Sequence, residues 1–116
     1  MPATFHANGL QVIDREVVDE AVRRIVEAFH PKRIIVFGSV ARGEAGPDSD
    51  LDLFIEMESS LRPIERAIRV RELLADAQWP MDIVVYTAEE MKDARTRFGN
   101  LMTFIDAEGV LLYERP

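Results

Sequence analysis

The chain has 116 residues, a formal net charge of −7 and no cysteine, which suits one domain over residues 1–116 and excludes disulfides and thiolate metal sites. The negative charge disfavours non-specific binding to nucleic acid, although a divalent metal would still allow one nucleotide to bind. No apolar run approaches the roughly 18 residues that cross a bilayer, and residues 1–9 lack a secretory signal, so we expect a cytoplasmic protein without a membrane segment.

The first half of the chain is predicted to form one long helix and two strands. Apolar residues at helical spacing predict a helix over about residues 14–29, which Pro31 ends. Residues 33–37 are nearly all apolar and β-branched, which is typical of a strand buried on both faces. After a short helical turn and a loop, residues 50–57 alternate, with Asp52 on the face opposite to the aliphatic side chains.

A second helix is predicted from Pro63 to about residue 77. Its apolar face is expected to join the core, while its basic side chains form a solvated surface or, as an alternative, a partner surface. The predicted core residues are Ile64, Ala67, Ile68, Leu74 and Ala75, and the basic residues are Arg62, Arg66, Arg69 and Arg71.

A third strand over residues 81–86 and a further helical segment complete the predicted core. Thr87 and Glu90 have capping-box spacing at the start of this segment, and residues 110–113 suit a short last strand. Its larger apolar side chains belong to the core or to a surface for a homo-oligomer, and they are Met91, Phe98, Leu101 and Met102. The order of elements predicts an α/β or α+β fold, with a small mixed β-sheet and helices packed against it.

Two aspartates on the second strand carry the strongest chemical signal. Residues two apart on a strand point the same way, so Asp50 and Asp52 place two carboxylates side by side. At about 4 Å such charges repel by roughly 1 kcal/mol in water and about 4 kcal/mol near a protein surface. A divalent cation such as Mg²⁺ turns this cost into attraction. The alternative is a solvated edge strand, and Glu56 and Glu58 are interpreted as solvated charges at the strand end.

Gly38 and Ser39 follow the first predicted strand and suit a phosphate group. A glycine allows close approach of the backbone, and the start of a helical turn with its serine hydroxyl favours an anion. Arg42 lies one turn later and is a candidate ligand for a phosphate oxygen. The alternatives are a plain strand-to-helix turn for the pair and a surface position for Arg42.

Asp82 is the third candidate carboxylate. It stands near the start of an otherwise apolar strand, where an unpaired carboxylate would be costly. If this strand lies beside that of Asp52, Asp82 completes a cluster that shares metal ions and accepts a proton from an attacking hydroxyl. The alternative is a polar strand end.

The pattern is Gly38-Ser39, ten intervening residues, Asp50-Leu51-Asp52, and later Asp82 on an apolar strand. It resembles the DNA polymerase β-type nucleotidyltransferase superfamily, and more narrowly its minimal nucleotidyltransferases, the MNT proteins found as antitoxins beside HEPN-domain toxins. The resemblance implies a polymerase β-like core, Mg²⁺ held by Asp50, Asp52 and Asp82 as catalytic residues, and nucleotide phosphates bound by Gly38 and Ser39.

The resemblance further implies transfer of a nucleoside monophosphate, usually AMP from ATP, to a hydroxyl of a partner protein, the HEPN-type toxin. An antitoxin of this kind silences its partner by adenylylation. Two alternatives stay open: a binding module that neutralises its partner by occlusion without turnover, and a transferase for a small molecule of the aminoglycoside type.

Overall fold

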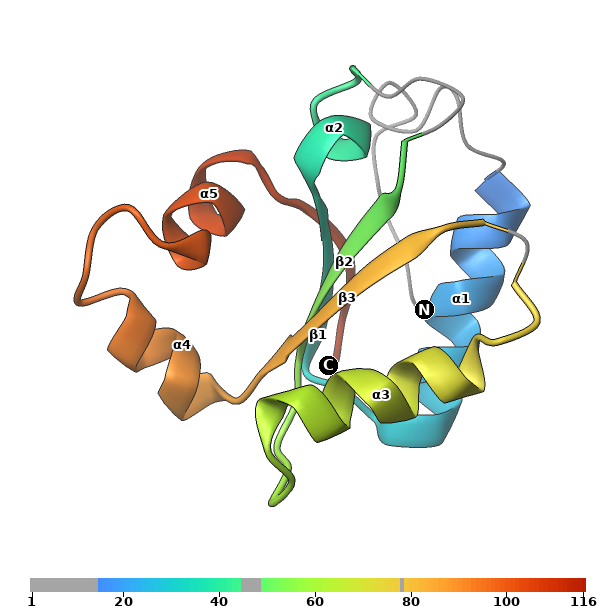
Figure 1. Ribbon diagram of the computed structural model, residues 1–116, viewed down its shortest axis with the longest axis horizontal. Coiled ribbons are helices and arrows are strands. Elements are labelled where there is room, and N and C mark those ends of the chain that lie inside the picture. The colour runs from blue at the N-terminus through green and yellow to red at the C-terminus, as the bar shows by residue number, and fades with distance from the viewer. Residues whose placement is uncertain (1–14, 45–48, 78) are drawn as a thin grey trace.

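The computed structural model describes residues 15–44, 49–77 and 79–116 and shows a four-stranded sheet with helices on both faces (Figure 1). The sheet has the strand order β3-β2-β1-β4, in which β1 is antiparallel to β2 and β4, and β2 is parallel to β3. This mixed sheet confirms the predicted fold class. No helix in the described ranges is long and apolar enough to cross a membrane. The elements are α1 (Arg15–Phe29), β1 (Arg33–Phe37), α2 (Gly38–Ala41), β2 (Leu51–Glu56), α3 (Pro63–Leu73), β3 (Met81–Tyr86), α4 (Ala88–Ala94), α5 (Leu101–Glu108) and β4 (Val110–Glu114).

The larger apolar cluster lies between the sheet and the helices α1 and α3. Helix α1 buries its apolar stripe in this cluster. Residue 14, the predicted start of this helix, lies outside the described residues. Strand β2 alternates as predicted, with its aliphatic side chains in this cluster and Phe54 on the opposite side of the sheet. Both faces of β2 are therefore covered, which explains why five of its six residues are buried.

The smaller apolar cluster lies on the other face, beneath α4 and α5. Phe54 packs edge-on against Tyr86, with ring centroids 5.3 Å apart. Thr87 and Glu90 form the predicted capping box, in which the Glu90 amide donates to the Thr87 hydroxyl at 3.2 Å. The helical segment divides in two, because α4 ends at Ala94 and Asn100 begins α5 by accepting a hydrogen bond from the amide of the second helical residue.

The predicted core face of α3 is only partly correct: Leu74 is buried as predicted and Ala67 is half-buried, but Ala75 is exposed. Ile64 is 64% exposed and Ile68 is also exposed, whereas Arg66 and Val70 are buried. The helix ends at residue 73 rather than near residue 77. The reason is that α3 turns toward the sheet the stripe that contains Arg66, whose charge is neutralised inside the fold and so does not require solvent.

Two further side chains differ from their predicted surroundings. Glu56 is 2% exposed rather than solvated, because Arg33 of the neighbouring strand donates to its carboxylate at 2.7 Å and the Lys32 ammonium lies 3.8 Å away. Phe98 is 96% exposed rather than part of the core, because it falls in the connection between α4 and α5, next to Gly99 with a φ of 90°. The alternative interpretation of Phe98 as part of an association surface stays a prediction.

Replacing Arg66 by methionine is expected to lower the free energy of unfolding by about 2 kcal/mol. The Arg66 guanidinium, 5% exposed, donates to both carboxylate oxygens of Glu90 at 2.6 and 3.2 Å and to the Leu61 carbonyl at 2.8 Å. The variant leaves these acceptors without their donor. Denaturant unfolding of the variant and the wild type measures the difference.

The matched control is Arg69→Met, which removes the same charge from an exposed position of α3 and is expected to change the unfolding free energy little. Arg66 also lowers the pKa of Glu90 through its hydrogen bond. A lowered carboxyl pKa contributes stability at pH values above the unfolded pKa, and the contribution is lost as pH falls through the folded pKa. An Arg66→Met variant as stable as the Arg69→Met control would contradict the assignment.

Candidate active site

The parallel pairing of β2 and β3 places Asp52 beside Asp82. The two residues are direct partners in the register of the strands, and the Leu51 amide donates to the Pro80 carbonyl at 2.9 Å where the pairing begins. Asp50, exposed, immediately precedes β2 and is two residues from Asp52. The sequence predicted that Asp82 would lie near Asp52 if their two strands were neighbours, and the fold meets this condition.

Electrostatics at Asp52 reflect this crowding. Burial raises the pKa of the Asp52 carboxyl above its ordinary value, and the neighbouring carboxylates of Asp82 and Asp50 raise it further, while Arg42 opposes them. Each carboxylate therefore makes ionisation of Asp52 more costly. Such a set of hard oxygen donors is chemically suited to a divalent cation, which would offset the repulsion.

The three carboxylates do not form a closed metal site as they stand. Within residues 15–44, 49–77 and 79–116, no three acidic, histidine or cysteine side chains are arranged to hold a metal ion. The Asp82 carboxylate accepts a hydrogen bond from Arg71 of α3 at 3.1 Å. The donor chemistry fits a divalent cation, and the metal role of these residues stays a prediction.

Gly38 lies against the Asp52 carboxylate. Strand β1 ends at Phe37, the register partner of Asp52, and Gly38 then adopts a φ of 74° as α2 begins. A Cβ atom at position 38 would overlap the Oδ2 atom of Asp52. The glycine is therefore required by close approach as well as by backbone conformation, which supports a site where backbone amides and this carboxylate converge.

The two other predicted phosphate ligands occupy different surroundings. Ser39 is partly buried in the first turn of α2, and its carbonyl accepts a hydrogen bond from the Glu44 amide at 2.9 Å. Arg42 is exposed, and its guanidinium donates to Glu44 at 3.0 Å and to Glu108 at 3.4 Å. A phosphate at Arg42 would compete with both glutamates, so Arg42 is less prepared for binding than Gly38.

Sequence reasoning missed two residues beside this site. Arg71 is exposed, in agreement with the predicted solvated face, but its contact with Asp82 was not predicted. Trp79 received no role, yet its indole N–H donates to the Ser49 carbonyl at 3.2 Å and so holds the chain just before Asp50. Neither contact has a sequence signature, because each joins segments that meet only in the folded chain.

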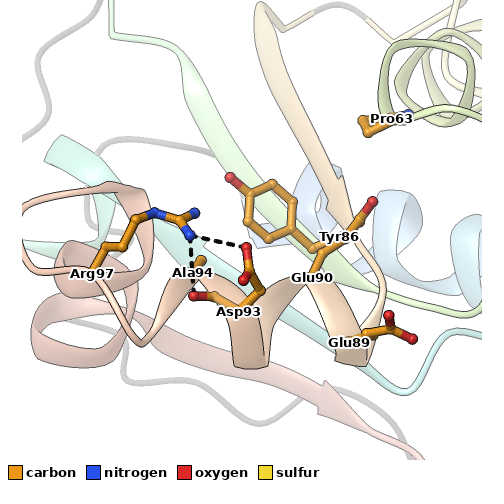
Figure 2. A pocket seen from close by; sticks show the side chains of 7 residues that line it. All are labelled: Pro63, Tyr86, Glu89, Glu90, Asp93, Ala94 and Arg97. Carbon is orange, nitrogen blue, oxygen red and sulfur yellow. Dashed lines mark hydrogen bonds and ion pairs between the residues drawn. The ribbon is translucent and has the colours of Figure 1, made fainter.

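A hollow of about 510 Å³ lies at the other end of β3, and Figure 2 shows the side chains that line it. Tyr86, the last residue of β3, lines it together with the start of α3 and with α4, and Arg97 at its rim donates to Asp93 at 3.0 Å. Asp82 lies at the second position of the same strand. The hollow is therefore separate from the carboxylates, and no predicted site residue lines it.

Comparison with known proteins gives a consistent result. Residues 18–104, more than half of the chain, match the profile of a family described as nucleotidyltransferase domain. The fold is similar to the crystal structure of a presumed nucleotidyltransferase from Sulfolobus solfataricus, with a TM-score of 0.64 and 18% sequence identity over 93% of this chain and 85% of that chain. At this identity the likeness supports the fold alone. No curated protein matches the chain.

Proposed function

Since the chain belongs to the nucleotidyltransferase domain family, we propose that it transfers AMP from ATP to an acceptor hydroxyl in a magnesium-dependent reaction. The observation that carries this proposal is the convergence of Asp52, Asp82 and Gly38 at the ends of three neighbouring segments of the chain. Burial, and then the acidic neighbours Asp82 and Asp50, raise the pKa of the Asp52 carboxyl, and the Gly38 backbone lies against this carboxylate. This arrangement suits a metal-bound triphosphate better than it suits a structural strand end.

The proposed roles follow from position. Gly38 and Ser39 bind the polyphosphate, and Asp50, Asp52 and Asp82 would hold Mg²⁺, which when bound would neutralise the charge of the phosphates. Asp82 accepts the proton of the acceptor hydroxyl. The acceptor oxygen attacks the α-phosphorus in line, the bond from that phosphorus to the bridging oxygen breaks, and pyrophosphate leaves with the electron pair.

We further propose that the acceptor hydroxyl belongs to a partner protein, a HEPN-type toxin, and that the chain acts as its antitoxin. The described residues form one sheet with its two covering layers, which we interpret as a single minimal domain over residues 1–116. Support for a partner protein comes from the exposure of two of the carboxylates. Asp50 and Asp82 are both exposed, so a macromolecule can approach them.

Calorimetric titration with ATP and Mg²⁺ tests the site. The double variant Asp50→Asn, Asp52→Asn is expected to bind the nucleotide at least about tenfold more weakly, a loss of roughly 1.4 kcal/mol. The control is Asp19→Asn with Glu58→Gln, which removes the same charge from exposed positions away from the site. Equal affinity in both double variants would overturn the assignment of the carboxylates.

A second candidate function is neutralisation of the partner by occlusion, without turnover. It is favoured by one observation, the open state of the carboxylate set, in which Asp82 is held by Arg71. Co-expression with the partner distinguishes the two functions. Full protection of cells by Asp52→Asn would support occlusion, whereas lost protection with an intact complex would support catalysis.

A further inference from the structure

Arg71 contacts Asp82, the third carboxylate of the proposed site, although Arg71 is not one of the motif residues that the sequence singled out. It lies in the last turn of α3, and its Nη2 atom is 3.1 Å from Oδ1 of Asp82. Strand β3 is an edge of the sheet, so Asp82 has β2 on one side and is open on the other, where Arg71 approaches. The guanidinium thus occupies a position from which a cation would bind the same carboxylate.

This ion pair is poorly suited to a purely stabilising role. Both side chains are 56% exposed, and pairs of this kind contribute little to folding. In contrast, the local charge balance depends on Arg71, because Asp50, Asp52 and Asp82 lie together and Arg42 is already engaged by Glu44 and Glu108. Arg71 is the cation that contacts Asp82 in the described part of the chain.

The Arg71 side chain has room to leave this pair. It lines a hollow of about 130 Å³ whose other walls are Leu74, Trp79, Met81 and Ile83. An arginine stem packs well on such apolar surface, and a guanidinium is attracted to an indole ring. The pair can therefore open without a movement of the backbone.

We propose that Arg71 is a positioning residue that holds Asp82 in the metal-free protein and competes with a divalent cation for its carboxylate. This inference rests on the proposed function, because it assumes that the cation binds at Asp82. A divalent ion and a guanidinium repel each other at this separation, so the Arg71–Asp82 pair opens when the cation binds. Binding of the bare cation is thereby weakened in the wild type.

The test is titration of the intact chain with Mn²⁺ in the absence of nucleotide, followed by calorimetry. Arg71→Gln is expected to bind Mn²⁺ roughly three- to tenfold more tightly than the wild type. Arg71→Lys keeps a positive charge on a different geometry and is expected to fall between the two. The matched control is Arg69→Gln, two positions away on the same helix and exposed, which removes the same charge without touching Asp82.

Thermal melting shows that each variant is folded before the titration, and the exposed pair predicts almost unchanged melting temperatures. Equal Mn²⁺ affinity in Arg71→Gln and Arg69→Gln overturns the inference alone, with the proposed function intact. Absence of Mn²⁺ binding in every variant overturns the inference together with the metal role of the carboxylates. Tighter binding confined to the Arg71 variants supports competition at Asp82.

Discussion

Replacing Asp52 by asparagine is expected to lower nucleotidyl transfer roughly a hundredfold to a thousandfold while leaving the fold at least as stable as the wild type. The loss of activity follows from its proposed place among the metal ligands. The gain in stability follows from its pKa, which burial raises first and the carboxylates of Asp82 and Asp50 raise further. An uncharged side chain of the same shape removes this repulsion.

The sign of the pH dependence is fixed by the same shift. A carboxyl whose pKa is higher in the folded state contributes stability that is fully present below the unfolded pKa and is lost as pH rises through the folded pKa. Near neutral pH this contribution of Asp52 is absent, and Asp52→Asn is therefore expected to melt at an equal or higher temperature. In acid the difference between variant and wild type should shrink or reverse.

The measurements are a transfer assay with labelled ATP and thermal melting across pH. Asp19→Asn, on the exposed face of α1, removes one charge elsewhere and should change neither activity nor the pH profile. Activity and stability move in opposite directions in a site that binds charge. A variant that loses both would instead indicate that Asp52 has a structural role, contrary to the proposal.

Gly38→Ala is expected to lower the free energy of unfolding by about 3 kcal/mol and to abolish nucleotide binding. Two costs add at this position. The φ of 74° disfavours any residue with a Cβ atom, and that atom would overlap Oδ2 of Asp52. Relief of the overlap moves the carboxylate or the start of α2, and either movement displaces proposed ligands of the triphosphate.

Gly99→Ala separates the two costs. Gly99 has a φ of 90°, but a Cβ atom there would meet nothing within 4 Å, so this variant reports the backbone cost alone, about 1 kcal/mol. Denaturant unfolding compares the variants, and calorimetry with ATP measures binding. Adding Asp52→Ala to Gly38→Ala should recover part of the stability without recovering binding. Equal losses of stability at positions 38 and 99 would show that Asp52 is not the obstacle.

Local sequence patterns predicted the strands well. The alternation around Asp52 specifies which side chains face each layer, because one residue of shift would bury the aspartate in the aliphatic cluster. The capping box at Thr87 was also readable, since both partners lie within one helical turn. Asp82 beside Asp52 required only that β3 join β2 in parallel, a condition that the sequence left open.

Contacts between distant segments were not readable. Arg66 is buried with Glu90, 24 residues later, as its counter-charge, while the predicted core residues Ile64 and Ile68 are exposed. Glu56 is buried for the same kind of reason, through Arg33. Arg71 meets Asp82 only because α3 ends beside the open edge of β3. In each case the contact joins two charged side chains that are brought together only by tertiary folding.

The apolar clusters on the two faces of the sheet differ in size, which implies that the two layers of helices differ in their resistance to local unfolding. Helices α1 and α3 cover most of the buried aliphatic residues, whereas α4 and α5 rest on a small group around Phe54 and Met102. We therefore expect the α4–α5 layer to have the lower free energy of local opening. Glu108 of α5 contacts Arg42, so each such opening would break this contact and leave the guanidinium paired with Glu44 alone. Local opening of the α4–α5 layer would thus change the ion pairing of Arg42 at the end of α2, while the global stability of the protein stays the same.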